Sequence, residues 1–194
     1  ADLAGLDSPR SLWREALAWQ GRIDVLVNNA ALLVLSPLDD TDDDWDDAWS
    51  RSFDVNVRAT ANLTREAVRH FRERKSGVLV NLSSWVAQRG SGNPHLLAYA
   101  ASKGAIKALT NTLARAHAKE GVLAYLIAPG VVKTQMSVDA AAAQGGEAAV
   151  TASLAMGEWV PPEEIGELVC FLATGRQRHL SGATFDVNGA TYIR

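Results

Sequence analysis

The chain has 194 residues, a hydrophobic fraction of 47% and a formal net charge of -3. This length suits one domain with a substantial core, and the mild acidity excludes the basic surface by which proteins bind nucleic acids or anionic membranes. No apolar run reaches the roughly 18 residues that a membrane helix needs, and no charged-then-apolar leader opens the sequence. The single cysteine, Cys170, excludes an internal disulfide and fits a reducing compartment, so we expect a cytoplasmic protein.

Short apolar segments alternate with longer amphipathic ones along the whole chain. The first predicted helix starts at Ser8-Pro9, with Ser8 as its cap and Pro9 at the first helical position, and ends at Gly21. The other predicted elements are a strand at 24–28, a helix at 41–75, a strand at 78–83, a helix at 96–120, a strand at 123–127, a helix at 161–171 and a strand at 183–187. Apolar strands separated by helices predict an α/β fold, a doubly wound parallel sheet with helices on both faces, in a single domain over residues 1–194.

Residues 133–160 form an Ala- and Gly-rich segment with weak periodicity. A segment with little apolar surface to bury tends to move, so we expect a mobile flap with some helix, placed over a substrate site. In the helix that follows, Cys170 stands among leucine, valine and phenylalanine, and we interpret it as a core residue.

Small, polar or turn-forming residues follow three of the predicted strands. These residues are Asn28-Asn29-Ala30-Ala31, Ser83-Ser84 and Pro129-Gly130. In an open parallel sheet, ligands bind beyond the carboxyl ends of the strands. The sequence therefore predicts a binding site at this edge of the sheet.

Tyr99 and Lys103 stand four residues apart on the predicted helix 96–120, in the run Tyr-Ala-Ala-Ser-Lys. This spacing places both side chains on one face of the helix. A free tyrosine titrates near pH ~10, and a nearby ammonium group lowers that pKa because it favours the phenolate. A Tyr-x-x-x-Lys pair alone occurs often by chance, so its meaning depends on the residues around it.

Five motifs in order carry a family resemblance: Asn28-Asn-Ala-Ala31, Asp54-Val-Asn-Val57, Asn81-Leu-Ser-Ser84, Tyr99-Ala-Ala-Ser-Lys103 and Pro129-Gly-Val-Val-Lys-Thr134. They occur in the order found in the short-chain dehydrogenase/reductase family, and the ending Ser181-Gly182 to Asp186-Val-Asn-Gly189 resembles that family's carboxyl terminus. The resemblance covers the chain from about Asp2 onward. It implies a Rossmann-like fold, and NAD or NADP as the coenzyme.

The resemblance also implies roles for individual residues. Tyr99 resembles the general acid/base, Lys103 its activator and a ligand of the nicotinamide ribose, and Ser84 the residue that orients the substrate oxygen. Asn56 resembles an asparagine that positions a water in a proton relay, although it could also bond to a backbone carbonyl at a kink. The remaining coenzyme contacts implied by the family are Asp2, Asn28, Ala30, Pro129, Gly130, Val132 and Thr134.

Three further residues are candidates for the wall of the substrate pocket. Trp85 follows Ser84 directly, His95 precedes the Tyr99 turn, and Trp159 lies at the end of the flap. Tryptophans are more often core residues than pocket walls. The four histidines lack the spacing of metal ligands, so no metal site is indicated.

The family's Gly-rich phosphate loop has no counterpart here, nor does the residue that selects NAD or NADP. We therefore expect a truncated chain that lacks about 50 to 60 residues, the first nucleotide-binding βαβ half. The strand at 24–28 would then be an open sheet edge, which is prone to aggregation.

The function implied by the resemblance is interconversion of a secondary alcohol and a ketone with NAD(P). A sugar or polyol, a 3-oxoacyl thioester, a steroid and a small ketone all stay open as substrates. The alternatives are a non-catalytic truncated member that acts as subunit, scaffold or nucleotide sensor, and a member that catalyses epimerisation or dehydration. We expect a homodimer or homotetramer built on the helices at 41–75 and 96–120, with no nucleic-acid or membrane partner.

Overall fold

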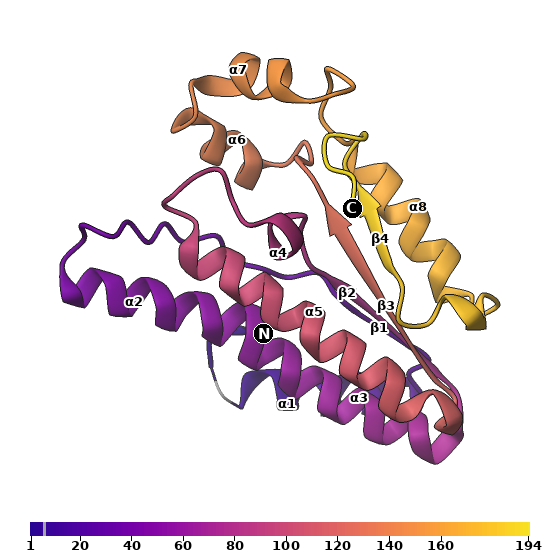
Figure 1. The fold of residues 1–194 in the computed structure, drawn as a ribbon. Helices are drawn as coiled ribbons and strands as arrows, with labels where there is room; N and C mark the ends of the chain where they lie inside the picture. Colours follow the sequence, from indigo (N-terminus) through magenta and orange to yellow (C-terminus); the bar gives the residue numbers. More distant parts are fainter. Residues whose placement is uncertain (6) are drawn as a thin grey trace.

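Four parallel strands form the centre of the molecule, in the spatial order β1-β2-β3-β4. The structure is a computed structural model that describes residues 1–5 and 7–194. The strands are β1 (Val25–Asn28), β2 (Gly77–Leu82), β3 (Val122–Pro129) and β4 (Thr184–Val187). They run as apolar segments linked by helical crossovers (Figure 1), which confirms the doubly wound α/β prediction.

The helices account for most of the chain between the strands. They are α1 (Ser8–Gln20), α2 (Asp42–Phe53), α3 (Thr60–Arg74), α4 (Val86–Arg89), α5 (Leu97–His117), α6 (Gln135–Ala142), α7 (Gly146–Ser153) and α8 (Pro162–Ala173). A π-helical segment, η1 (Asp54–Ala59), joins α2 to α3, and short 3-10 segments lie at η2 (Ala118–Glu120) and η3 (Arg178–Leu180). None of the described helices combines the length and apolarity that a bilayer span would require.

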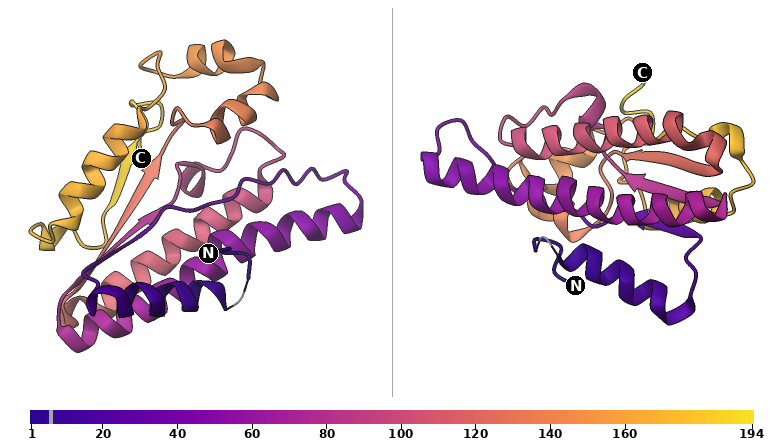
Figure 2. Two further views of the ribbon diagram at one scale, coloured as in Figure 1. Left: turned by 180° about the vertical axis from the view of Figure 1, so that it is seen from behind. Right: turned by 90° about the horizontal axis from the view of Figure 1, so that it is seen from below.

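Alternate residues of the strands pack against opposite layers of helices. Val78, Val80 and Leu82 of β2 face α8, where Leu172 completes the cluster. Leu79, between them, faces the other layer, with Ala114 of α5. This alternation follows from the twofold repeat of a strand, and it buries both faces of the sheet. Figure 2 shows α1, α3 and α5 on one side of the sheet and α8 on the other.

The predicted helix at 41–75 is continuous in the structure but not uniformly α-helical. Thr41 caps its start, since its side chain accepts a hydrogen bond from the Asp44 backbone. At η1 the backbone hydrogen-bonding pattern changes from α-helix to π-helix, which the sequence periodicity did not predict. The first helix also differs slightly from expectation, because Ser8 lies inside α1 and Asp7 occupies the capping position without a side-chain bond.

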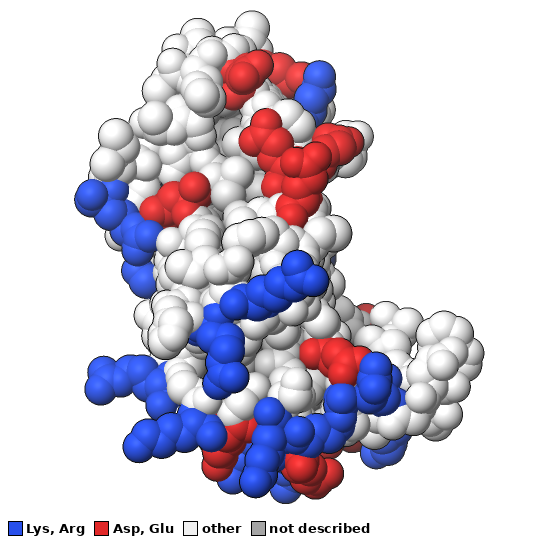
Figure 3. All heavy atoms as spheres, turned by 90° about the vertical axis from the view of Figure 1, so that its right-hand side faces the viewer, with Lys and Arg blue, Asp and Glu red and all other residues white. Residues whose placement is uncertain are grey.

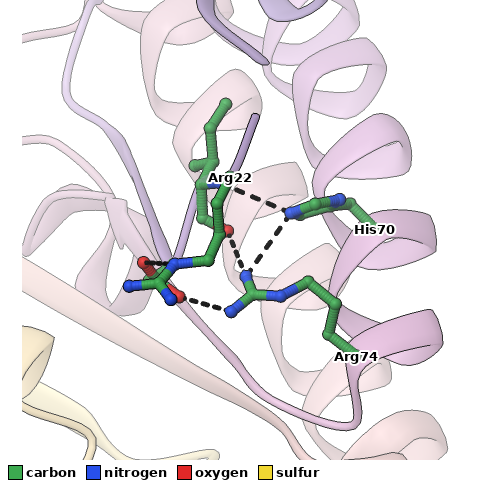
Figure 4. A network of polar contacts seen from close by, with 5 residues as sticks. Arg22, His70 and Arg74 are labelled. Atoms are coloured by element: carbon green, nitrogen blue, oxygen red, sulfur yellow. Dashed lines mark hydrogen bonds and ion pairs between the residues drawn. The ribbon is translucent and has the colours of Figure 1, made fainter. Parts of the chain in front are cut away.

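A polar network fixes the entry of β1 to α3 (Figure 4). Arg74 donates to the carbonyl of Ile23 at 2.9 Å and to the carboxylate of Asp24 at 2.7 Å. Arg22 binds the other oxygen of Asp24 at 3.0 Å. His70 accepts from the backbone N–H of Ile23 at 3.4 Å. The hydrogen bond from Arg74, assisted by the charge of Arg22, holds the pKa of Asp24 below its usual value, so this carboxylate is ionised at neutral pH.

One edge of the sheet is uncovered. Within residues 1–5 and 7–194, no strand pairs with the outer side of β1. An apolar groove of about 510 Å³ runs beside it, lined by Trp13, Trp19 and Val27 among others. Trp19 is 81% exposed and Val27 is 38% exposed. Groove and edge together form an apolar surface of the kind that associates in solution.

The segment at 133–160 contains α6 and α7 and a small core of its own. Ala141, Leu154 and Trp159 are buried together there. Its two ends are joined by a parallel bridge between Val132 and Val160. The segment therefore has more structure than its composition indicates, and its mobility stays a prediction.

The prediction that Cys170 is a core residue was wrong, because its side chain is exposed on α8.

The face that carries α8 shows a separation of charge: acidic side chains gather in its upper half and most Lys and Arg in its lower half (Figure 3). The helix α8 itself carries Glu163, Glu164 and Glu167. The basic side chains on this face thus gather toward the end where α3 terminates.

Candidate active site

A cavity of about 690 Å³ lies beyond the carboxyl ends of β1, β2 and β3. This is the edge at which the sequence predicts a binding site. Residues at the ends of β1, β2 and β3 line this cavity, together with Tyr99 and Lys103 of α5. The predicted site residues among its lining are Ala30, Ser84, Tyr99, Lys103, Pro129, Gly130, Val132 and Thr134.

Tyr99 lies in this cavity beside Ser84. Burial raises the pKa of Tyr99 to about 12, and a hydrogen bond with the Ser84 side chain opposes this rise. We expected Lys103 to lower the pKa of Tyr99. Burial of the phenol dominates instead, because it disfavours the charged form. Tyr99 is therefore protonated at neutral pH and has a proton to donate.

Lys103 lies one helical turn from Tyr99. Its Nζ is 5.7 Å from the centre of the Tyr99 ring and donates a hydrogen bond to the carbonyl of Leu82 at 3.0 Å. Only 4% of Lys103 is exposed, and burial lowers its pKa to about 8. The ammonium group thus exists at neutral pH but loses its proton in mildly alkaline solution.

Ser83 and Ser84 differ in their roles. The Ser83 hydroxyl donates to the carbonyl of Lys103 at 2.9 Å and so ties the end of β2 to α5. Ser84 carries the hydroxyl that reaches the phenol of Tyr99. The geometry therefore favours Ser84 over Ser83 as the residue that would contact a substrate oxygen.

A buried chain of hydrogen bonds supports these strand ends. Asn28 and Asn81 are register partners on β1 and β2, and their side chains bond at 2.8 Å. Asn28 also donates to Thr64 of α3 at 3.1 Å, and Asn81 donates to Thr110 of α5 at 2.8 Å. This series of hydrogen bonds connects α3 to α5 through the ends of β1 and β2. The resemblance assigns Asn28 to the adenosine ribose, and its side-chain nitrogen already donates to Asn81 and Thr64.

Asn56 lies in the middle of η1, 2% exposed. Its side chain accepts from the backbone N–H of Leu32 at 2.7 Å and donates to the carbonyl of Leu32 at 2.8 Å. It also donates to the Ser102 hydroxyl at 3.0 Å. The structure thus shows the backbone-binding role at a distorted helix. The relay role stays a prediction, and the side-chain amide is already engaged.

Ser36 is a positioning residue that the sequence did not reveal. It is fully buried, and its hydroxyl accepts from the backbone N–H of Ala98, in the first turn of α5. The residue at the capping position, Leu96, has no side chain able to do this. No local pattern could have identified Ser36, since its partner lies 62 residues further along the chain.

The structure places the remaining predicted residues in different surroundings. Trp85 lines a second cavity that adjoins the first. His95 is exposed and lines neither cavity, although its carbonyl accepts from the Ser36 backbone. Trp159 is buried in the core of the 133–160 segment, where its indole N–H donates to Thr151. Asp2 is exposed and bonds to the backbone of Ala4, away from both cavities.

Comparison with known proteins shows similarity over almost the whole chain. The family model described as Enoyl-(Acyl carrier protein) reductase matches residues 1–190. The 3beta-hydroxysteroid dehydrogenase 1 of Eggerthella lenta is 33% identical over 97% of this chain and 71% of its own length. The 3-oxoacyl-(acyl-carrier-protein) reductase FabG of Staphylococcus aureus is 30% identical over 100% of this chain and 76% of its own.

Solved structures are similar as well. A Beutenbergia cavernae protein with bound NADP at low occupancy has a TM-score of 0.88 and 32% identity, covering 98% of this chain and 74% of its own. A 3-oxoacyl (acyl-carrier-protein) reductase from Agrobacterium tumefaciens C58, with NADP bound, has a TM-score of 0.85 and 29% identity. That match covers 97% of this chain and 72% of the other.

Proposed function

The chain belongs to the short-chain dehydrogenase/reductase family, and we propose that it interconverts a secondary alcohol and a ketone with NAD or NADP. The observation that carries the proposal is the placement of Ser84, Tyr99 and Lys103 around one cavity at the carboxyl ends of the strands. The relatives named above include a hydroxysteroid dehydrogenase and 3-oxoacyl reductases, and the two solved structures bind NADP.

The lining of the larger cavity suits the nicotinamide half of such a coenzyme. Lys103 has three N–H donors, of which the Leu82 carbonyl takes one, so donors are left for ribose hydroxyls. Pro129, Gly130 and Val132 offer a backbone wall, with the Thr134 hydroxyl beyond them. When bound, the nicotinamide ring supplies or accepts the hydride.

In the direction of reduction, the residues of this chain handle the proton. Ser84 donates a hydrogen bond to the ketone oxygen and holds it beside the phenol. Tyr99 then gives its proton to that oxygen as the hydride reaches the carbon, so the ketone gains one hydride and one proton and becomes an alcohol. Lys103 stabilises the phenolate that is left, and the proton returns from solvent.

Oxidation is the reverse and needs the phenolate form of Tyr99. With a pKa of about 12, that form is scarce at neutral pH. The rate of oxidation should therefore rise with pH. The same residues would serve an epimerase or dehydratase, but no feature of the cavity favours those reactions.

We also propose that the protein is a homodimer or homotetramer that acts in the cytoplasm. The outward face of α5 carries Ala101, Ala105 and Ala108 and leaves open space at Gly104, which permits close approach of a second helix. The exposed, free thiol of Cys170 suits a reducing compartment.

Turnover of the Tyr99→Phe variant tests the proposed reaction. Oxidation of NADPH by the wild-type chain is followed with a panel of ketones and 3-oxoacyl thioesters. Tyr99→Phe should lower kcat by at least ~10²-fold and leave coenzyme affinity nearly unchanged, because only the transferable proton is lost. Tyr192→Phe is the matched control and should behave as wild type. Near-normal turnover by Tyr99→Phe would refute the role of Tyr99 in proton transfer. NADPH binding without turnover of any substrate would favour the non-catalytic alternative.

A further inference from the structure

A second cavity, of about 140 Å³, opens beside the reacting groups. The two cavities share Ser84, Tyr99, Gly130, Met136 and Ser137. A substrate whose carbonyl lies between Ser84 and Tyr99 would therefore extend its remaining atoms into this second space. Its volume is well below the ~300 Å³ at which cavities begin to hold drug-sized ligands, so it suits a small molecule.

Arg89, an exposed residue, is the charged residue that lines this second cavity. It lies at the end of α4, and its guanidinium carbon is 4.5 Å from the centre of the Trp85 ring. Trp85 is itself fixed, since its backbone N–H donates to the carbonyl of Pro129 at 2.9 Å. A guanidinium stacked on an aromatic face keeps its N–H groups in its own plane, where they can donate to a planar anion.

The acidic groups of the described chain leave Arg89 without an ion-pair partner. No Asp or Glu lines either cavity. Asp186, next to α4 in space, already accepts from Gln88 and from Arg194, the latter at 2.8 Å. The ion pairs found among residues 1–5 and 7–194 do not include Arg89. An exposed cation that lies over Trp85, and that forms no ion pair among the described residues, thus lines the same cavity as Ser84 and Tyr99.

We propose that Arg89 binds a carboxylate of the substrate, which makes the substrate a small hydroxy acid or the corresponding keto acid. The inference rests on the proposed function for the position of the reacting carbonyl. The carboxylate interaction itself is a binding event and can be measured without turnover. Paired hydrogen bonds from a planar guanidinium to a carboxylate are strong and directional, which suits this role.

Levulinate and 2-pentanone provide a matched pair of probes. Both are methyl ketones with the same chain, and only levulinate ends in a carboxylate. Their affinities for the full chain are measured by ligand-observed NMR titration, and their turnover is followed by NADPH oxidation. The variants are Arg89→Met, Arg89→Lys and the control Arg115→Met. Arg115 lies sixteen residues after Tyr99 on α5, about 24 Å along the helix, so it tests the effect of net charge alone.

The wild type should bind levulinate about tenfold more tightly than 2-pentanone. Arg89→Met should reduce that preference to within about twofold, Arg89→Lys should keep part of it, and Arg115→Met should keep all of it. Equal affinities in the wild type, an unchanged preference in Arg89→Met, or no binding of either ketone would overturn the inference. Arg89-dependent binding of levulinate without NADPH oxidation would refute the proposed reaction and leave the carboxylate site standing.

Discussion

The Ser36 hydroxyl lies 3.0 Å from the backbone nitrogen of Ala98 and caps the helix that carries Tyr99 and Lys103. The loop after β1 therefore determines where that helix begins. A second bond, from the Ser36 backbone N–H to the carbonyl of His95 at 2.8 Å, fixes the residues just before the helix. Tyr99 is one residue beyond the capped nitrogen, so its position depends directly on this contact.

Replacing Ser36 with alanine should destabilise the protein by about 1 kcal/mol, because the Ala98 N–H loses its buried acceptor. It should also lower kcat about three- to tenfold, since a small misplacement of the phenol slows proton transfer. Urea unfolding gives the first value and NADPH-linked turnover the second. Thr112→Ala, which removes an exposed hydroxyl from the same helix, should change neither. A kcat that stays at the wild-type value, well below the melting temperature, would show that Ser36 contributes to stability only.

The pH dependence of alcohol oxidation should reveal the titration of Lys103. Below the pKa of Tyr99 the phenolate fraction, and with it the rate, rises about tenfold per pH unit. Above the Lys103 pKa of about 8 the ammonium charge is lost, so the rise should flatten near that pH. Lys103→Met should be slower and show no inflection, and it should bind coenzyme more weakly. Lys107→Met, one turn further along α5, should keep the inflection; a profile identical for wild type and Lys103→Met would show that Lys103 does not act on Tyr99.

Hydrogen exchange should identify residues 135–155 as a region that opens readily and closes over bound coenzyme. Met136 and Ser137 of α6 line both cavities, so a ligand there contacts the segment directly. Exchange is measured with and without NADPH, and we expect faster exchange here than in β2 and β3, with protection on binding. Strong protection of these residues without coenzyme would contradict the prediction of a mobile flap.

The open edge at β1 should make the chain associate as its concentration rises. Light scattering and binding of a hydrophobic dye measure this directly. Val27→Lys should reduce both, because a charged side chain on an edge strand opposes further strand pairing. Leu38→Lys introduces the same charge at an exposed leucine outside the strand and should have little effect. A chain that stays monomeric at high concentration would show that the β1 edge and its groove do not mediate association.

The strands and long helices were predictable because their signals are local. Apolar β-branched runs mark the strands, and polar caps or Gly residues mark several helix ends, as at Thr41 and Gly21. The predicted bounds lie within a few residues of the observed ones. Cys170 shows how such a signal can be misread. The buried positions of α8 follow helical spacing through Ile165, Leu168, Val169 and Leu172, and Cys170 lies outside that pattern.

The features that sequence alone did not reveal depend on contacts between distant segments. The π-helical turn at Asn56 is stabilised by Leu32, 24 residues earlier. The cap on α5 comes from Ser36, 62 residues before its partner, and Asp186 binds Gln88 of α4 from 98 residues further along the chain. The direction of the Tyr99 pKa shift belongs to the same class, because burial is a property of the whole fold.

A short bridge closes the base of the 133–160 segment, which lines both cavities through Met136 and Ser137. Val160 donates to the carbonyl of Val131 and Lys133 donates to the carbonyl of Val160, each at 2.9 Å. With its two ends joined, the segment between them can change in length or sequence at small entropic cost, because loop-closure entropy grows slowly with length. We therefore expect substitution within residues 135–159 to change which substrates are accepted, while Ser84, Tyr99 and Lys103 stay where the sheet and α5 hold them.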